Sequence, residues 1–322
     1  MKQYIIRRIS ISIFVLLGVS FLIYGILRVM PGDFVEQMTS GNPSITAEQK
    51  EALRESYGLN GTVIEGYTSW VKNAMKGDFG KSFLYSKPVT EVIKGRMWTS
   101  FTLSAIAFVI QLCIAIPLGI VAATKQYTKT DYLIVFLALA GISLPSFFLA
   151  AVLQRTFAMG LGWLPLSGMV TARKSFTGFR LTLDIGYHFV LPIAVFAITG
   201  MGSWLRYVRT NMLEVLNADY IRTARAKGLS ERKVITKHGF RNTLIPIVTF
   251  IGGTIPSLFA GAIISEGIFS IPGLGKAALD AVNSKDLPFL MGYLMFMAVL
   301  TLLGTLISDI LYAVVDPRIR YN

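Results

Sequence analysis

The hexapeptide Gly77–Ser82 (GDFGKS) is the stretch of this sequence that most nearly matches a catalytic motif. It ends in Gly-Lys-Ser, as do the loops that surround the phosphates of ATP with backbone N–H groups. A phosphate loop also needs a glycine five residues before Gly80, and that position is Met75. The stretch therefore does not predict nucleotide binding.

Other catalytic or ligand-binding patterns are equally incomplete. Gly273–Ala278 (GLGKAA) is half of a dinucleotide fingerprint, without the strands that the fingerprint needs. Neither HExxH nor Gly-x-Ser-x-Gly occurs. Cys113 is the single cysteine, and His188 and His238 are too few for a His-rich metal site. We predict no catalytic, cofactor-binding or metal-binding residue in this chain.

The basic loop 209–243 carries the strongest functional signal. Residues 218–227 favour helix, with Asn217 or Asp219 as a possible N-cap. Gly228 follows as a natural stop, because glycine adopts the positive φ that ends many helices. The loop is thus predicted to contain a short, well-terminated helix.

A second short helix is predicted after this stop. Ser230 can cap it, and Glu231 places a negative charge in its first turn, where it suits the helix dipole. The cations on the two helices are Arg222, Arg225, Lys227, Arg232, Lys233 and Lys237. Such a loop can contact anionic lipid headgroups or serve as a rigid docking surface. We prefer docking, because a loop that only sets topology needs no capped helices.

The composition places these residues in a membrane protein. Of 322 residues, 53% are hydrophobic and 15% are charged, whereas a soluble domain carries about a quarter charged residues. A helix that crosses the hydrocarbon core needs about 20 predominantly apolar residues. The sequence therefore predicts an all-α integral membrane protein with six transmembrane helices. The six segments are 9–29, 99–123, 132–153, 188–208, 244–266 and 289–312.

The charge distribution predicts the orientation of these helices. The chain has 31 Lys and Arg against 18 Asp and Glu, a net charge of +13. With both termini in the cytoplasm, 16 Lys and Arg lie on the cytoplasmic side and 6 on the other, once the long segment 31–98 and the adjoining Arg28 are left out. Cytoplasmic loops are enriched in these residues. Topology thus explains the net charge, and no nucleic-acid partner is expected.

Three regions follow from the spans. Residues 1–30 hold the cytoplasmic N-terminus and the first transmembrane helix, and residues 31–98 form a small extracytoplasmic helical insertion. Residues 99–322 form the core, with five further helices and the loop 209–243.

Helix signals also occur inside the insertion. Thr46 and Gln49 have the spacing of a capping box and predict a helix over 47–57, with Gly58 as its stop. Residues Tyr67–Met75 predict a second short helix.

Prolines and glycines are concentrated in the second to fifth spans, as expected for a bundle that bends around a path. Candidate path residues are Pro145, Pro256 and Glu266. For Glu266, a helix-end carboxylate with a backbone or arginine partner is an equally open interpretation. Neither Glu266 nor Asp309 forms the buried acid chain of a proton-driven carrier, which argues against secondary transport without excluding it.

The stretch Asp219–Pro246 (DYIRTARAKGLSERKVITKHGFRNTLIP) resembles the EAA loop of permease subunits in ATP-binding-cassette importers. The resemblance continues in order along nearly the whole chain, through Pro31–Asp33, Gly77–Ser82, Ser265–Val282 and Asp316–Arg320. The chain is similar in particular to the B-type permease subunit of the oligopeptide, dipeptide and nickel importers. This resemblance implies the type I permease fold.

The resemblance also implies an ATPase-coupling site in the loop. Its residues here are Asp219, Tyr220, Arg222, Ala224, Arg225, Ala226, Lys227 and Gly228. Arg222 and Thr223 stand where the general motif has Glu and its first Ala, and Pro246 follows Gly228 at a longer spacing. These departures are typical of the peptide branch, but they prevent transfer of the glutamate contact to Arg222.

Several partners are implied by the same resemblance. A second homologous permease would pair with this chain, and two cytoplasmic ATPases would hydrolyse ATP with Mg²⁺. An extracytoplasmic substrate-binding protein would deliver oligopeptides. This chain would form the path in the lipid of a bacterial or archaeal cell membrane, without being an enzyme itself. Dipeptides or nickel remain alternative substrates, and a self-sufficient secondary carrier is the rival class.

Overall fold

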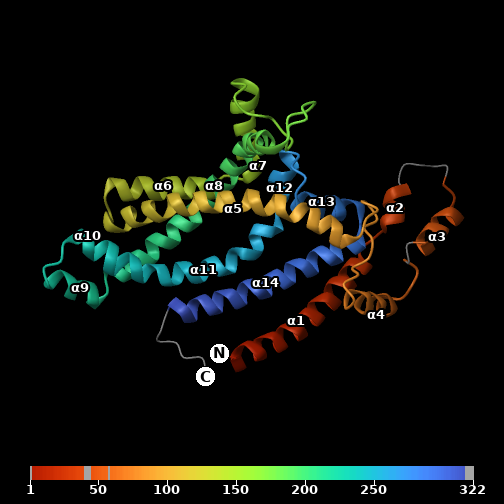
Figure 1. The fold of residues 1–322 in the computed structure, drawn as a ribbon, viewed down its shortest axis with the longest axis horizontal. Coiled ribbons are helices and arrows are strands. Elements are labelled where there is room, and N and C mark those ends of the chain that lie inside the picture. The colour runs from red at the N-terminus through yellow and green to blue at the C-terminus, as the bar shows by residue number, and fades with distance from the viewer. Residues whose placement is uncertain (1, 40–44, 57–58, 316–322) are drawn as a thin grey trace.

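The computed structural model describes residues 2–39, 45–56 and 59–315, and within these ranges every regular element is a helix (Figure 1). The predicted helix stop at Gly58 and the terminal motif Asp316–Arg320 lie outside the described residues. In the part described, the predicted all-α class is confirmed.

Among the described residues, five helices are long and apolar enough to cross a membrane. They are α1 (Lys2–Val29), α5 (Val89–Thr124), α8 (Gly178–Leu216), α11 (Arg241–Ala260) and α14 (Leu287–Val315). All five correspond to predicted spans, although α5 and α8 begin about ten residues early. The 39 residues of α8 make a helix about 58 Å long, so its ends extend beyond a hydrocarbon core about 30 Å thick.

The predicted third span, 132–153, is broken in the structure. α6 (Lys129–Ser143) ends before Pro145, and α7 (Ser146–Leu153) leaves at an angle of 97°. A proline disfavours helical backbone at the residue before it, and Leu144 accordingly has an extended ψ of 123°. The predicted count of six spans therefore holds only if this bent pair counts as one.

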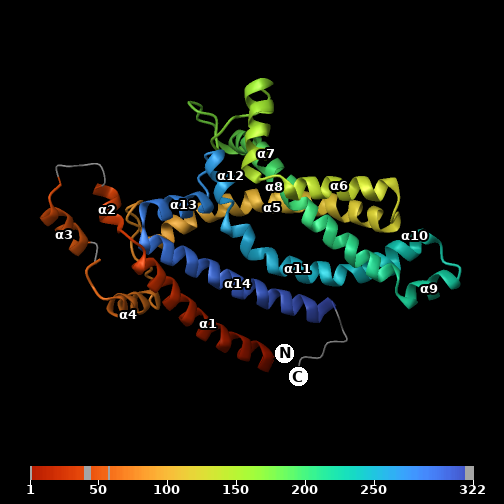
Figure 2. The ribbon, with the colours of Figure 1, turned by 180° about the vertical axis from the view of Figure 1, so that it is seen from behind.

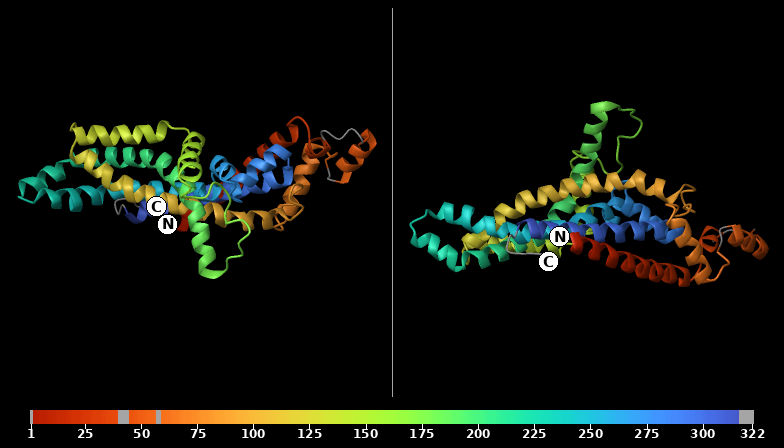
Figure 3. Two further views of the ribbon diagram at one scale, coloured as in Figure 1. Left: turned by 90° about the horizontal axis from the view of Figure 1, so that it is seen from above. Right: turned by 60° about the horizontal axis from the view of Figure 1, so that its bottom comes forward.

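The segment after the break projects from the bundle (Figures 1 and 3). It continues from α7 through the π-helix η1 (Gln154–Gly160) to the start of α8. Leu149 and Ala150 of α7 are buried in a hydrophobic cluster with Phe269 and Ile271. The bend is thus held by packing against a late part of the chain.

Small residues let the central helices α5, α6 and α8 pack closely. A Cβ added at Gly202 would lie 2.2 Å from the carbonyl oxygen of Ala138, and one added at Gly141 would lie 2.9 Å from that of Ile198. Any larger side chain would push α6 and α8 apart. Membrane helices commonly use small residues in this way, because helix association in lipid depends on close packing.

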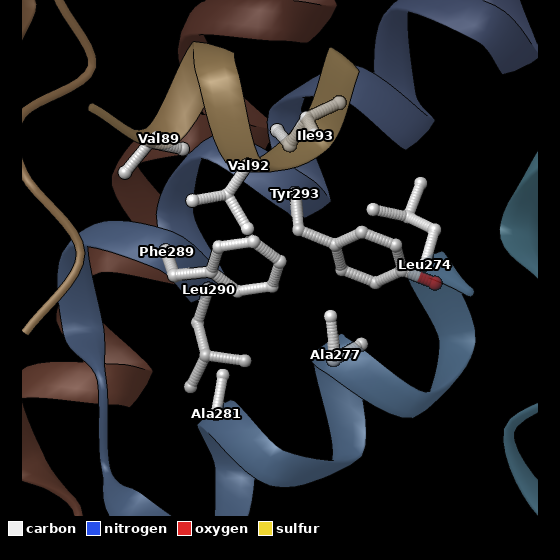
Figure 4. Close-up of a cluster of buried hydrophobic side chains, with 10 residues drawn as sticks. Val89, Val92, Ile93, Leu274, Ala277, Ala281, Phe289, Leu290 and Tyr293 are labelled. Atoms are coloured by element: carbon white, nitrogen blue, oxygen red, sulfur yellow. The ribbon is translucent and has the colours of Figure 1, made fainter. Parts of the chain in front are cut away.

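A second contact region lies at the end of the bundle where α5 begins. Here the first turns of α5 pack on α13 (Leu274–Ser284) and α14 (Figure 4). Val89 and Val92 of α5 are buried with Phe289 and Tyr293 of α14. This cluster fixes the start of α5 against the C-terminal part of the chain.

The segment between α1 and α5 contains three short helices, α2 (Phe34–Thr39), α3 (Ala47–Ser56) and α4 (Val63–Ala74). The predicted capping box at α3 is confirmed. The Gln49 N–H donates to Oγ1 of Thr46 over 3.3 Å, and the Thr46 N–H donates to Oε1 of Gln49 over 3.0 Å.

α4 begins four residues before the predicted start at Tyr67 because a second capping box lies upstream. The Glu65 N–H donates to Oγ1 of Thr62 over 3.3 Å, and the Thr62 N–H donates to Oε2 of Glu65 over 3.1 Å. Hydrogen bonds from the hydroxyl and the N–H of Thr62 lower the pKa of the Glu65 carboxyl. The Thr-x-x-Glu spacing was present in the sequence and was missed.

Candidate functional site

The basic loop 209–243 forms one end of the molecule, at the opposite end from α3 (Figures 1 and 2). Its first residues, 209–216, form the end of α8, and α9 (Asp219–Ala226) follows. α10 (Glu231–Lys233), the π-helix η2 (Val234–Phe240) and α11 then follow one another without a break. The second predicted helix is therefore not short but is the first part of a membrane-spanning helix.

The N-terminus of α9 differs in detail from the prediction. Ala218, not Asn217 or Asp219, occupies the N-cap position. The side chain of Asn217 instead donates to the carbonyl oxygen of Leu213 over 3.0 Å and so caps the end of α8. Asp219 is the first helical residue, where its charge suits the helix dipole.

The predicted stop at Gly228 is confirmed. Gly228 has a φ of +75°, which side chains other than glycine rarely adopt. Its N–H donates to the carbonyl oxygen of Arg225 over 2.9 Å, and the Leu229 N–H donates to that of Ala224 over 3.4 Å. These two bonds form a Schellman motif, which satisfies the last carbonyls of α9.

The turn between the two helices is closed by an ion pair. Nε of Arg225 lies 2.7 Å from Oε1 of Glu231. Ser230 occupies the predicted N-cap position, but its side chain makes no capping bond. Because the Arg225 and Glu231 side chains are both exposed, their pair contributes at most about 1 kcal/mol. The ion pair therefore fixes the orientation of the turn but adds little to its stability.

An apolar cluster anchors α9 to its neighbours. Ile221 and Ala224 of α9 are buried with Val234 of η2, and Val215 of α8 packs on them. Ile221 and Val234 were not among the predicted site residues. The spacing of Ile221 and Ala224 offered a signal for Ile221, because apolar residues three apart lie on one face of a helix. α9 is thus a packed element and not a flexible tether.

The other face of α9 is exposed. Seven of the eight predicted coupling residues lie on it or at its end, whereas Ala224 is buried and cannot touch a partner. The seven are Asp219, Tyr220, Arg222, Arg225, Ala226, Lys227 and Gly228. Asp219 and Arg222 pair with each other at 3.2 Å, and their side chains remain 94% and 73% exposed.

Further cations enlarge this charged surface. Lys227, Arg232, Lys233 and Lys237 are exposed, and none forms a salt bridge to another described residue. The surface formed by the exposed side of α9 and these cations is positively charged. It therefore suits an acidic protein groove or anionic headgroups.

A buried ion pair links the helix before α9 to α6. Both guanidinium contacts from Arg209 of α8 to the carboxylate of Asp131 measure 2.8 Å. Asp131 is 2% exposed and also accepts a 3.0 Å bond from the Tyr127 N–H. A bidentate pair of this kind is geometrically specific. It fixes the loop between α5 and α6 to α8 close to the charged surface.

Glu266 does not line an open path in this structure. It lies on α12 (Ile263–Ile268) and is fully buried. Its Oε1 accepts from the Ala262 N–H and the Ser100 hydroxyl, and its Oε2 accepts from the Lys276 N–H. The structure therefore supports the alternative interpretation, a helix-end carboxylate with backbone partners.

The two candidate path prolines lie in different surroundings. Pro145 is exposed at the break between α6 and α7. Pro256 is buried between α11 and α14, where a Cβ added at Gly304 would lie 2.9 Å from its Cδ. The structure does not bring Pro145, Pro256 and Glu266 together at one site.

The GDFGKS stretch serves as a tether. Ser82 donates a 2.5 Å hydrogen bond to the buried carboxylate of Asp286, which also accepts from the Leu84 N–H over 3.0 Å. These bonds fix the segment before α5 to the start of α14. Within the described ranges, no three His, Cys, Asp or Glu side chains gather closely enough to hold a metal ion.

These features define an α-helical integral membrane protein with a packed helix that exposes a charged side at one end. Comparison with known proteins names the family. The chain belongs to the binding-protein-dependent transport system inner membrane components, whose main domain matches residues 115–321 and whose N-terminal domain matches residues 1–105.

Full-length relatives carry more specific names. The chain is 41% identical over 322 residues to the oligopeptide transport system permease protein AppB of Bacillus subtilis, covering 100% of both chains. It is 35% identical to the dipeptide transport system permease protein DppB of Escherichia coli, again over 100% of both. A putative peptide permease protein of Brucella ovis is 35% identical over 99% of both.

Proposed function

We propose that this chain is the membrane permease subunit of an ATP-driven, binding-protein-dependent peptide importer, with the type I permease fold. The name of the 41% identical relative favours oligopeptides as the substrate. Dipeptides remain the nearest alternative, and nickel the more distant one. ATP and Mg²⁺ belong to the partner ATPases, so the chain is not itself an enzyme.

The observation that carries this proposal is the construction of α9. Ile221 and Ala224 anchor the helix to α8 and η2, while its charged side faces outward. A docking element must be stiff if movement of its partner is to move the membrane helices. A loop that only contacted lipid headgroups would not need an apolar anchor.

Movement of α9 would reach several membrane helices. α8 precedes it, η2 continues into α11, and the Arg209–Asp131 pair extends the connection to α6. ATP-driven closure of two ATPases under a pair of permeases would thus shift these helices together. The second permease, a homologue of this chain, would carry its own coupling loop.

The proposed topology places both termini and α9 in the cytoplasm. The segment 31–98 and the region 267–288 would then face the substrate-binding protein on the other side. The tether between Ser82 and Asp286 holds these two regions together, as a shared docking surface requires.

Co-purification from the native membrane tests the assignment. We expect a second permease, two Walker-type ATPases and a substrate-binding protein to stay bound, as identified by mass spectrometry. The double variant R222E/K227E should lose the ATPases, because it reverses two charges on the exposed side of α9. The control R173E/K174E, two exposed cations in the loop before α8, should keep them.

Two results would overturn the proposal. Recovery of the chain alone, with uptake that needs no ATPase, would assign it to secondary carriers. Full retention of the ATPases by R222E/K227E would show that the charged surface serves another purpose, such as contact with headgroups. Uptake assays with labelled peptides and with nickel then identify the cargo.

A further inference from the structure

The membrane helices expose two different kinds of surface. α1 and α6 expose long apolar side chains, as lipid requires; they include Phe14, Leu22, Ile26, Leu133, Phe136 and Leu137. Between Leu191 and Leu216 of α8, no large hydrophobic side chain is exposed, and on α11 only Phe250 is. The exposed faces of α8 and α11 are therefore poorly suited to lipid tails.

Polar residues replace the missing apolar ones at helical spacing. The exposed positions of α8 include Ser203, Arg206, Thr210 and Glu214. On α14, Thr301, Thr305 and Tyr312 are exposed beside the apolar Val299, Leu303 and Ile307. On α11, Gly253 and Ser257 are exposed four residues apart. Spacings of three and four align such residues along one side of each helix.

A groove lies where these three helices meet. Its volume is about 390 Å³, which is within the range of small-molecule sites. Its lining includes Tyr207 of α8, Thr249, Phe250, Gly253 and Thr254 of α11, and Ser308 of α14. No side chain in its lining is ionisable at neutral pH.

Four of the five hydroxyl groups that line the groove, all except that of Tyr312, donate their protons to backbone carbonyl oxygens. Thr254 donates to the carbonyl oxygen of Ile251 over 2.7 Å, and Ser308 donates to that of Thr249 over 2.6 Å. Tyr207 donates to the carbonyl oxygen of Pro246 over 3.2 Å. A hydroxyl oxygen that has donated its proton still offers lone pairs. The groove thus presents acceptors, which suit a ligand rich in N–H donors.

We propose that this groove is the part of the substrate path supplied by this chain, and that it holds an extended peptide through backbone N–H groups. Because the lining is uncharged, it would accept peptides whatever their side-chain charge. This inference rests on the proposed function and assigns that function to a specific surface. Glu266, Pro145 and Pro256 would then position helices and would not touch the substrate.

Cysteine labelling tests the groove in the assembled transporter. In a Cys113→Ser background, Gly253→Cys places a thiol in the groove, and Gly18→Cys places one on the lipid-type face of α1. A Cβ at either glycine meets no atom within 4 Å, so both variants fit the fold. The probe is a membrane-impermeant maleimide in inside-out vesicles, with and without excess tri-alanine and penta-alanine.

We expect G253C to be labelled, with labelling reduced at least threefold by the peptides, and G18C to stay unlabelled. Three results would overturn the proposal. Labelling of G253C that peptides do not reduce would make the groove a water-filled surface without substrate. Labelling only by a lipid-soluble maleimide would make it a lipid face. Cross-linking of G253C to the second permease at a rate that peptides do not change would make it a closed subunit interface.

A pair of matched substitutions measures the contribution of one acceptor. Thr254→Val removes a groove hydroxyl while keeping the side-chain shape. Thr124→Val removes an exposed hydroxyl that donates to the Ile120 carbonyl oxygen at the end of α5, outside the groove. One lost hydrogen bond corresponds to about a fivefold change in binding.

We therefore expect T254V to raise the apparent KM for penta-alanine uptake about fivefold, while T124V leaves it unchanged. An unchanged KM in T254V would remove this acceptor from the path. If the wild-type transporter takes up neither peptide, the proposed function itself fails. Uptake without peptide protection of G253C would refute only the groove.

Discussion

Ser100 on α5 donates a 2.7 Å hydrogen bond to Oε1 of Glu266 on α12. The Ser100 oxygen in turn accepts a 2.7 Å bond from the N–H of Leu274, at the start of α13. Both Ser100 and Glu266 are fully buried. Two side chains therefore join α5 to α12 and α13, whose contacting residues lie 166 and 174 residues later in the chain.

Replacing Glu266 by Gln should destabilise the fold. Both carboxylate oxygens accept hydrogen bonds, whereas a Gln side chain has one acceptor, so a buried N–H or hydroxyl loses its partner. The expected cost is about 1–3 kcal/mol, measured as a lower Tm of the detergent-solubilised complex. Asp280→Asn is the control, because Asp280 is partly exposed and its pair with Lys276 lies near the surface. Equal Tm values for E266Q and wild type would contradict this role.

Replacing Gly228 by Val should weaken coupling. Gly228 has positive φ but open space around its Cβ position, so the substitution tests backbone strain without steric overlap. A left-handed conformation costs an L-residue about 1–2 kcal/mol, and Asn tolerates it better. We expect G228V to reduce ATP-dependent uptake severalfold and G228N to stay near wild type, at equal membrane levels. If G228V transports normally, the turn at the end of α9 is not needed for coupling.

Replacing Pro145 by Ala should allow a fraction of the molecules to adopt a straighter α6–α7 segment. Spin labels at Leu139 and Val152, both exposed, report its length by electron–electron double resonance in a Cys113→Ser background. Thirteen residues of continuous helix span about 20 Å, more than the same residues span across a 97° bend. An unchanged distance distribution would mean that packing of α7, and not Pro145, holds the bend.

Acid should weaken the N-terminus of α4. Hydrogen bonds from Thr62 lower the pKa of Glu65 in the folded state. A carboxyl with a lowered pKa stabilises the fold above its unfolded pKa and loses that contribution as the pH falls through the folded pKa. We expect hydrogen-exchange protection of the Gly66 amide, corrected for intrinsic exchange rates, to fall below about pH 4. Glu65→Gln should show no such acid transition, and a transition that persists in E65Q would exclude the capping carboxylate as its cause.

Signals between near neighbours in the sequence sufficed to predict the turn in the charged loop 209–243. The stop at Gly228 and the first-turn position of Glu231 depend on neighbours within about one helical turn, and the structure contains both. The anchoring residues Ile221 and Val234 were missed, because their importance lies in a cluster that also includes part of α8. The charged face of α9 was thus predicted from the sequence, whereas the contacts that hold this helix in place became visible only in the structure.

Hydropathy and capping patterns in the sequence determined the helical class, five of the spans, the start of α3 and the end of α9, because these signals act through near neighbours. Only the tertiary structure decided what each proline does. Four prolines lie inside continuous helices: Pro117, Pro192, Pro246 and Pro256. Pro145 instead marks a 97° bend, stabilised where α7 buries Leu149 against Phe269. That partner lies more than a hundred residues later in the chain, so the bend depends on contacts that exist only after the helices have packed.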